Sequence, residues 1–226
     1  MVNDLRELSR RFQNYTEEIE SQLPDTCVLS NETQKYRDYL SCRGFNPEEV
    51  TENYGLKFTP ESPYVYCGQN LSNYIVFPVY DFNNRVVSFV ARSVSPTSLI
   101  RYTFPPNSCA KDFGWGNQLI KNKSFVVITE GTMDAMKLLS VGVPAIACLG
   151  INVNYAFIKN IVKNYKFAMV IFDNEPEALK QQTKLVNALS LLIPCYTIQY
   201  MYDNDLGACS ESQLNEIKNK IYKKIK

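Results

Sequence analysis

Carboxylates follow three apolar segments in the second half of this chain. The segments are 125–129, 167–172 and 195–202, and the acids that come after them are Glu130, Asp173, Glu175, Asp203 and Asp205. Asp134 adds a sixth carboxylate, four residues after Glu130 and therefore on the same face of a helix that begins there. Like charges this close need compensation, which a hard divalent cation with oxygen ligands supplies. These residue types predict Mg²⁺, with Mn²⁺ as the alternative, and phosphoryl-transfer chemistry.

Alternating strand and helix patterns place these acids at one edge of a sheet. From residue 124 onward, apolar runs alternate with amphipathic stretches, which predicts strands at 125–129, 145–148, 167–172 and 195–200 and helices at 132–141, 154–164 and 176–191. This alternation is typical of a parallel sheet with helices on its faces. Ligands of such sheets bind beyond the carboxyl ends of the strands, where the acids lie in the sequence.

The first half of the chain shows other patterns. Residues 1–34 predict a polar helical extension, because Leu5, Leu8, Phe12 and Tyr15 recur at spacings of three and four. The next part, 35–120, predicts a mixed α+β subdomain, and the last part, 121–226, holds the parallel sheet and ends in a basic amphipathic helix at 210–226.

The α+β subdomain begins with two short helices. Asn31 and Gln34 resemble a capping box for the first helix, which ends at Gly44, and Asn46–Pro47 starts the second. Residues rich in aromatic and β-branched side chains then predict strands at 64–66, 73–80, 85–92 and 101–104. Asn83–Asn84 separates two of these strands and predicts a hairpin turn.

Composition narrows the chemistry further. The 226 residues include no histidine, which rules out a Ser-His-Asp triad or a Cys-His pair within the chain. The seven cysteines form no CxxC pair, which argues against zinc. A net charge of +1 gives no overall attraction to nucleic acid, so basic groups would have to cluster locally. With no long apolar run and no secretory signal at the N-terminus, we expect a cytoplasmic protein without a membrane span.

Simpler interpretations exist for single residues. Asp173 alone is equally consistent with an N-cap for the next helix, and Arg92 with a solvated or ion-paired side chain. Tyr102 alone fits packing better than base stacking, and the lysines of 218–226 fit a solvated helix face better than a phosphate site. The combination of acids at the ends of three strands is what favours a functional site.

Short motifs in the second half resemble the Toprim family. The stretch VVITEGTMDAM at 126–136 resembles the first Toprim motif, and VIFDNE at 170–175 resembles the DxD motif of the family. ACLG at 147–150 resembles the segment after its second strand. Upstream, the segments 39–44, 77–92 and 101–102 resemble the N-terminal half of the DnaG-type primase polymerase core. The resemblance covers roughly residues 35 to 220.

This resemblance implies a fold and an activity. The fold is α/β, a Toprim-type parallel sheet flanked by helices and preceded by the mixed α+β subdomain. The activity is that of a DNA-dependent RNA primase, a nucleotidyltransferase that acts on a single-stranded DNA template with ribonucleoside triphosphates. Its catalytic residues would be Glu130, Asp134 and Asp173. Its metal ligands would be Glu130, Asp173, Glu175, Asp203 and Asp205. Its contacts with template or nucleotide would be Arg92, Arg101, Tyr102 and Lys111. A replicative helicase or separate replication proteins would be partners.

Departures from the family pattern leave other functions open. Glu175 stands where the family has Asp, Pro176–Ala178 replaces an Ala-Gly pair, and Arg101 replaces Lys. The zinc-binding domain of such primases is missing from this sequence, which suggests a compact, phage-like version. One alternative is a Toprim-type metal-dependent nuclease, and another is a non-catalytic nucleic-acid-binding replication accessory with a decayed site. A topoisomerase fits less well, because it needs a separate domain with a strand-breaking tyrosine.

Overall fold

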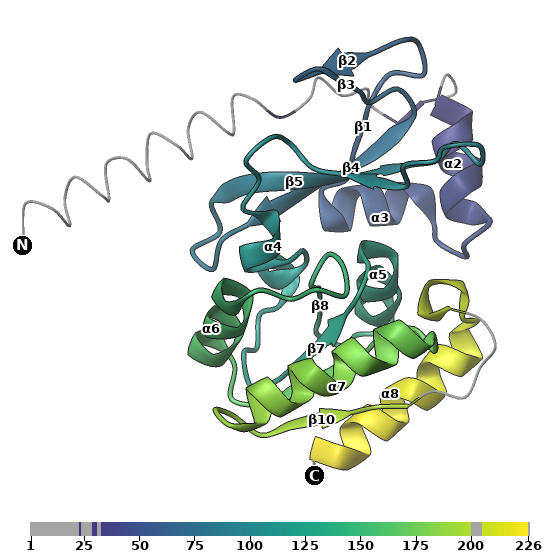
Figure 1. Ribbon diagram of the computed structural model, residues 1–226. Helices are drawn as coiled ribbons and strands as arrows, with labels where there is room; N and C mark the ends of the chain where they lie inside the picture. The colour runs from purple at the N-terminus through teal and green to yellow at the C-terminus, as the bar shows by residue number, and fades with distance from the viewer. Residues whose placement is uncertain (1–22, 24–28, 31–32, 200–204, 226) are drawn as a thin grey trace, which may run out of the picture. The chain divides into compact units, whose positions relative to one another are not determined.

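The computed structural model describes residues 23, 29–30, 33–199 and 205–225. The chain forms two compact units, Met1–Ala110 and Lys111–Lys226, and the boundary falls inside the short helix α4 (Ala110–Phe113; Figure 1). The sequence places its boundary later, between residues 120 and 121. The predicted helical extension at 1–34 falls almost entirely outside the described residues.

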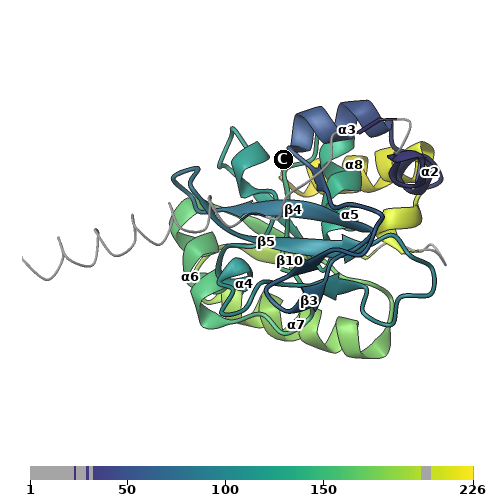
Figure 2. The same ribbon diagram turned by 90° about the horizontal axis from the view of Figure 1, so that it is seen from above.

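The first unit is built on an antiparallel sheet. Its strands run in the order β1 (Lys57–Phe58), β4 (Tyr74–Tyr80), β5 (Val86–Ser93) and β6 (Tyr102–Thr103), and Figure 2 shows β4 and β5 side by side. The sequence predicts β4 and β5 well and misses β1, which has only two residues.

The predicted hairpin turn joins β4 to β5. Asn84 has a φ of 61°, the positive value that asparagine tolerates better than most residues. Asp81 fixes the turn, because its Oδ1 accepts hydrogen bonds from the backbone nitrogens of Asn83 (2.8 Å) and Arg85 (3.0 Å). Arg85 also forms an ion pair with Asp81 at 2.6 Å.

Two short helices precede this sheet, α2 (Gln34–Ser41) and α3 (Pro47–Tyr54). The N-cap of α2 is Thr33, which makes no side-chain capping bond and whose Oγ1 instead hydrogen-bonds to the backbone of Ser30. The predicted capping box rests on Asn31, which lies outside the described residues. The start of α3 is as predicted, because the Asn46 side chain accepts from the Glu49 backbone N–H at 3.1 Å.

A small hairpin, β2 (Val65–Tyr66) with β3 (Gln69–Asn70), covers part of the sheet. Tyr64 and Tyr66 pack against buried side chains of β4 and β5, and the Tyr66 ring lies 5.8 Å from the Phe89 ring. This apolar contact joins the hairpin to the core of the unit.

The second unit contains the predicted parallel sheet. Its order is β10 (Cys195–Thr197), β9 (Ala168–Ile171), β7 (Val126–Thr129) and β8 (Ala145–Ala147), and all three neighbouring pairs are parallel. Every residue of β7, β8 and β9 is buried, as expected for strands covered on both faces.

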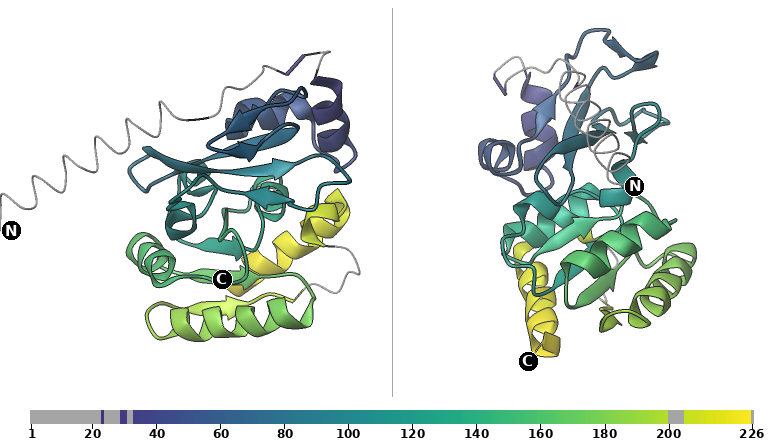
Figure 3. Two further views of the ribbon diagram at one scale, coloured as in Figure 1. Left: turned by 45° about the horizontal axis from the view of Figure 1, so that its top comes forward. Right: turned by 90° about the vertical axis from the view of Figure 1, so that its left-hand side faces the viewer.

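Helices cover both faces of this sheet. On one face α5 (Thr132–Ser140) packs beside α8 (Glu211–Ile225), and on the other α6 (Tyr155–Asn164) packs beside α7 (Pro176–Ser190), as the right-hand view of Figure 3 shows. Short 3₁₀ turns occur at η2 (Asn117–Leu119) and η3 (Leu206–Ala208). This arrangement confirms the predicted α/β fold with a parallel sheet flanked by helices.

A segment that the sequence does not predict closes the free edge of β8. Trp115 and Ala147 exchange two backbone hydrogen bonds of 2.9 Å. The approach is so close that a Cβ atom at Gly114 would lie 2.6 Å from the Ala147 carbonyl oxygen, and Gly114 has a φ of 69°. Glycine is therefore required there for both space and conformation. Within the described ranges, no helix combines the length and the apolar character that crossing a bilayer needs.

Candidate functional site

The carboxyl ends of β7 and β9 bring two acids together. Thr129 at the end of β7 pairs with Ile171 at the end of β9, so Glu130 and Asp173 leave neighbouring strands at the same edge. Burial, together with the charges of Asp173 and Glu175, raises the pKa of Glu130 to about 7. The raised pKa means that these carboxylates lie within electrostatic reach of one another.

Asp134 belongs to the same group of acids. It lies in the first turn of α5, where its Oδ2 accepts a hydrogen bond from the Gly131 backbone N–H at 3.0 Å. The pKa of Asp134 is raised to about 7, mainly by burial and then by the charge of Asp173. The Gly131 hydrogen bond opposes this shift, and the charges of Asp205 and Glu130 add to it. Asp134 therefore serves as a helix cap and also faces the other acids.

Asp205 reaches this group from the segment after β10. It precedes η3, which packs on α5. A Cβ atom at Gly207 would lie 3.0 Å from Asp134 Oδ1 and 3.6 Å from Asp205 Oδ1, so the two carboxylates flank this buried glycine. Asp203 lies outside the described residues.

The end of β9 shows that Asp173 is not a helix cap. The N-cap of α7 is Glu175, which makes no side-chain capping bond. The strand end is held instead by Gln182, a buried residue of α7 whose Oε1 accepts a hydrogen bond from the Phe172 backbone N–H at 2.8 Å. The capping interpretation of Asp173 is therefore wrong.

A turn after β8 fixes the backbone of Glu130. The backbone nitrogens of Leu149 and Gly150 both donate to the Glu130 carbonyl oxygen, at 3.0 and 3.2 Å. Leu149 and Gly150 have positive φ values of 65° and 124°. The sequence marks this turn only through its resemblance to a family segment; nothing in its residue types reveals that it positions Glu130.

The carboxylate oxygens at this edge of the sheet are the type of ligand that a hard cation prefers. The candidate ligands are carboxylate oxygens that raise one another's pKa, and Mg²⁺ takes a few carboxylates together with waters and substrate phosphates. In the part of the chain that the structure describes, no three Asp, Glu, Cys or His side chains converge tightly enough to hold an ion on their own.

The predicted basic residues fall into two places. Arg92 and Tyr102 face each other across β5 and β6, and the Arg92 guanidinium donates to the hydroxyls of Tyr102 and Tyr39. Arg92 lies 4.7 Å from the Tyr102 ring centre, and Arg43 lies 4.8 Å from that of Tyr39. The sequence predicts Arg92 and Tyr102 and misses the role of Tyr39, although Tyr39 lies in a segment that resembles the primase core.

Arg101 and Lys111 lie apart from this tyrosine pair. Arg101 is exposed and is joined to β5 through its carbonyl oxygen, which accepts from the Ser93 backbone N–H at 2.9 Å. Lys111 belongs to the second unit, and its Nζ would lie 3.7 Å from a Cβ atom at Gly150, in the turn that holds Glu130. Lys111 is thus the predicted basic residue nearest to the acids within their own unit.

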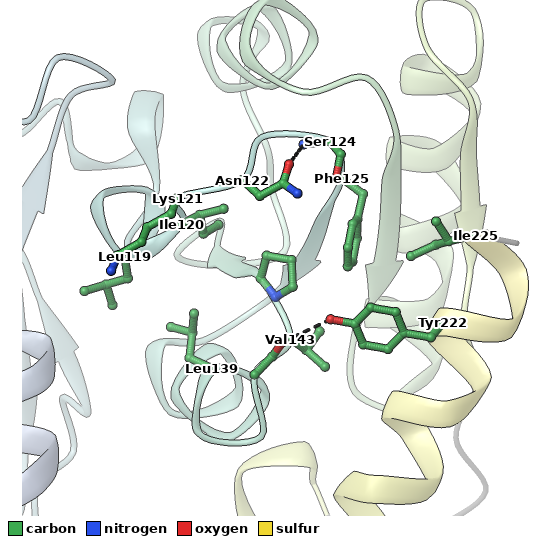
Figure 4. A pocket seen from close by; sticks show the side chains of 12 residues that line it. Leu119, Ile120, Lys121, Asn122, Ser124, Phe125, Leu139, Val143, Tyr222 and Ile225 are labelled. Carbon is green, nitrogen blue, oxygen red and sulfur yellow. Dashed lines mark hydrogen bonds between the residues drawn. The ribbon is translucent and has the colours of Figure 1, made fainter.

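An apolar pocket of about 540 Å³ lies at the opposite end of the parallel sheet (Figure 4). Phe125 and Pro144, which precede β7 and β8, form part of its wall with Tyr222, whose hydroxyl donates to the Gly142 carbonyl oxygen at 3.1 Å. None of the predicted site residues lines it. The chemistry of the acids therefore belongs to the other end of the sheet.

Comparison with solved structures defines the class of this fold. A DnaG primase catalytic domain bound to single-stranded DNA superposes with a TM-score of 0.76 at 14% identity, over 95% of this chain and 80% of that one. The Aquifex aeolicus primase, with its zinc-binding and RNA polymerase domains, gives a TM-score of 0.71 at 18% identity, over 93% and 59% of the two chains. The chain has the fold of a DnaG-type primase catalytic core.

Sequence comparison also finds similarity to DNA primases. The chain is 27% identical to the DNA primase of Campylobacter jejuni over 125 residues and 28% identical to that of Mycoplasma genitalium over 128 residues. These matches cover 51% and 52% of this chain but only 20% and 21% of the two primases. A family described as a domain of unknown function (DUF3854) matches residues 115–226. The resemblance to DnaG-type primase cores is confirmed.

Proposed function

We propose that this chain is a primase core, a nucleotidyltransferase that joins ribonucleotides into short RNA primers on a single-stranded DNA template. The observation that carries the proposal is the convergence of acids from β7, α5, β9 and the segment after β10 at one sheet edge. The similarity to DNA primases supports a primase-like function for this edge.

Glu130 is suited to a role beside the attacking 3′-hydroxyl. Burial and the neighbouring carboxylates raise its pKa to about 7, so near neutral pH the carboxyl exchanges a proton readily and acts as a general base or as a metal ligand. Asp134 faces the same group with a similar pKa and helps to set the charge at this edge. The turn at 149–150 holds the Glu130 backbone in place while the proton moves.

The remaining acids would hold Mg²⁺, or Mn²⁺ in its place. Asp173, Glu175, Asp203 and Asp205 are the proposed ligands with Glu130. When bound, such ions neutralise phosphate charge and orient the reacting groups. The protein's own part is to present oxygen ligands whose mutual repulsion is relieved only when positive charge arrives.

Basic groups would hold the template and the nucleotide. Arg92 keeps its full charge because its partners are neutral hydroxyls, so it remains available for a phosphate. Arg101 is exposed next to Tyr102, and Lys111 lies near the turn that holds Glu130. We propose single-stranded DNA and ribonucleoside triphosphates as the substrates, with a replicative helicase or separate replication proteins as partners.

The direct test is primer synthesis. The purified protein is incubated with single-stranded DNA, labelled ribonucleotides and Mg²⁺ or Mn²⁺, beside the double variant Glu130→Gln, Asp173→Asn. The matched control is Glu52→Gln, Glu61→Gln, which makes the same kind of change at two exposed acids of the first unit. RNA products that persist in the control and vanish in the site variant support a primase. Metal-dependent loss of the DNA without synthesis would indicate a nuclease.

One observation favours a non-catalytic accessory as the second candidate. Glu175 stands where the resembled family has Asp, and Pro176–Ala178 stands in place of its Ala-Gly pair, so the acidic motif after β9 departs from the family pattern. A decayed site would show no stabilisation of the fold by Mn²⁺, whereas at a working site the stability rises with the logarithm of the Mn²⁺ concentration once that exceeds the dissociation constant. Mn²⁺-dependent thermal unfolding of the wild type and the site variant separates the two.

A further inference from the structure

The carboxyl-terminal half of α8 carries a cluster of exposed lysines beside the last strand of the parallel sheet. This lysine cluster consists of Lys220, Lys223 and Lys224, and it lines a pocket of about 660 Å³ together with residues 197–199 at the end of β10. Its members are three and four residues apart, so they lie on one side of the helix within about one turn, or about 5.4 Å. Among the described residues that line this pocket, none is an acid.

The fold uses the lysines of α8 in two different ways. Lys218 donates a hydrogen bond of 2.6 Å to the Val141 carbonyl oxygen and so ties α8 to the end of α5. Within the described ranges, no acid forms an ion pair with the lysine cluster, and its hydrogen bond to the fold is a long one, 3.5 Å from Lys224 Nζ to the Thr197 carbonyl oxygen. The helix dipole favours cations in the last turn, but Lys220 lies before that turn. The charge of the cluster is therefore open to a ligand.

An aromatic ring lies next to the lysine cluster. Tyr196 of β10 is 48% exposed, and Lys224 Nζ lies 5.5 Å from the centre of its ring. The Phe167 ring, which precedes β9, lies 5.4 Å from the Tyr196 ring and helps to hold it in place. The residue types of the tail favour a solvated helix face, whereas the pocket and the exposed ring favour a bound ligand. Cations together with an exposed aromatic ring are the combination that binds single-stranded nucleic acid.

The apolar face of α8 argues against a membrane surface as the ligand. Leu214, Ile217 and Ile221 form this face, and all three are buried in the fold. A helix that binds a membrane surface needs its apolar side chains free to enter the lipid. An acidic peptide would offer charge to the lysines but no flat base to the ring. A nucleic-acid strand uses both parts of the surface.

We propose that the lysine cluster and Tyr196 form a contact for single-stranded nucleic acid in the second unit. The lysines bind phosphates of the strand, and one base stacks on the Tyr196 ring. The contact does not read sequence, because every nucleotide has a phosphate and every base has a flat face. The proposal goes beyond the proposed function, since this surface uses none of the acids at the other sheet positions and needs no metal. Binding in EDTA therefore measures it directly.

The first experiment measures binding of the full chain to a fluorescein-labelled oligodeoxythymidine in EDTA, by fluorescence anisotropy at several salt concentrations. The variant that changes all three lysines of the cluster to Gln should bind about tenfold more weakly or worse. The slope of log affinity against log salt should fall by about two, because each phosphate contact on a single strand contributes about 0.7.

The matched control removes the same number of charges from the helices on the other face of the sheet. It changes three exposed lysines of α6 and α7 to Gln: Lys159, Lys163 and Lys184. Its affinity should fall by about threefold at most, because it changes the total charge and removes no contact. Equal losses of affinity in the two triple variants would overturn the proposal.

The second experiment tests the stacked base. Tyr196→Ala should weaken binding by about fivefold or more, as for the loss of one stacked base, whereas Tyr155→Ala, at a tyrosine of α6 that is 78% exposed, should have no effect. On an abasic strand of the same length, the loss in Tyr196→Ala should disappear and the loss in the lysine variant should remain. A loss in Tyr196→Ala that persists on the abasic strand would contradict the stacking.

Thermal unfolding of each variant shows that the fold is kept. The changed side chains are exposed, so the midpoints should stay within about 2 °C of the wild type. If Tyr196→Ala does not fold, Tyr196→Leu takes its place, because leucine keeps an apolar contact with Phe167 and lacks the flat ring. A lysine variant that keeps its DNA affinity but loses binding to phosphatidylcholine vesicles with added phosphatidylserine would assign the surface to a membrane and overturn the proposal.

These outcomes are separate from those of the proposed function. A wild type that makes no primers but shows the losses at the lysine cluster and Tyr196 would contradict the primase and support the strand contact. A wild type that makes primers while the lysine variant binds DNA like its control would support the primase and reject the strand contact.

Discussion

The two units treat charge in opposite ways. In the first unit, the Arg92 guanidinium donates to two tyrosine hydroxyls and lies near both rings, so neutral groups satisfy its hydrogen bonds. In the second unit, the carboxylates of Glu130 and Asp134 face other carboxylates, which raise the pKa of both. The first arrangement is complete within the fold, whereas the second gains from a cation that comes from outside.

This difference shows where the stability of the fold and the binding of a ligand make opposite demands on charge. A cluster of like charges lowers the stability of the fold, and a ligand of opposite charge that binds the folded protein offsets this loss. A cation held by neutral partners stabilises the fold and keeps its charge for a polyanion. We therefore expect that removing the charge of Arg92 lowers the stability of the first unit, whereas removing the charge of Glu130 leaves the stability of the metal-free second unit equal or higher.

The largest effect is expected at Glu130. Glu130→Gln should reduce primer synthesis by about a hundredfold or more, since it removes the proposed base or metal ligand while keeping the shape. The same variant should unfold at an equal or higher temperature without metal at pH 8, because it relieves repulsion. Primer yield and thermal unfolding are measured on the same preparation; loss of both activity and stability would break the contrast.

The sequence was sufficient for the longer helices and strands and for placing Glu130 and Asp173 directly after two buried strands, because these features depend on local patterns. The runs that became β7 and β9 are apolar throughout, and Glu130 and Asp173 follow them directly. It could not show the bridge between Trp115 and Ala147 or the contact of Arg92 with Tyr39, since these residues are far apart in the chain. Such long-range contacts depend on packing and leave no periodic signal.

Lys137 was also beyond reach from the sequence. A lysine in a predicted amphipathic helix normally indicates an exposed position, and only the folded structure shows that Lys137 of α5 is buried.

Arg92 should give the next largest effect. Arg92→Gln should weaken binding of single-stranded DNA by roughly tenfold and reduce the slope of log affinity against log salt by about one, as for the loss of one phosphate contact. It should also lower stability, because Tyr39 and Tyr102 lose a shared donor. The control is Lys57→Gln, at an exposed lysine of β1 in the same unit. Equal losses of affinity in the two variants would show that only total charge matters.

The pH dependence of stability sharpens the comparison in the second unit. The folded pKa values of Glu130 and Asp134, about 7, lie above the ordinary values of 4.5 and 3.8, so the folded state binds protons more tightly than the unfolded state. Without metal, stability should therefore fall as pH rises from about 4 to about 7 and stay level above that, by on the order of 1 kcal/mol per group after solvent screening.

Urea unfolding in EDTA across this pH range measures the slope. Glu130→Gln should reduce it, and saturating Mn²⁺ should reduce it as well, because the ion favours the ionised carboxylates. A slope that is unchanged in both conditions would mean that these acids do not repel one another in the folded protein.

The smallest effect is expected from the tyrosine that faces Arg92. Tyr102→Phe removes one hydroxyl acceptor and keeps the ring, while Tyr39 still accepts from the guanidinium. We expect a loss of about 1 kcal/mol in unfolding free energy and at most about a threefold loss in DNA affinity. The control is Tyr155→Phe, at a tyrosine that is 78% exposed on α6. The double variant Tyr39→Phe, Tyr102→Phe should cost more than the two single changes together, because only then does Arg92 lose every hydroxyl that holds it; a merely additive cost would mean that the two tyrosines hold Arg92 independently.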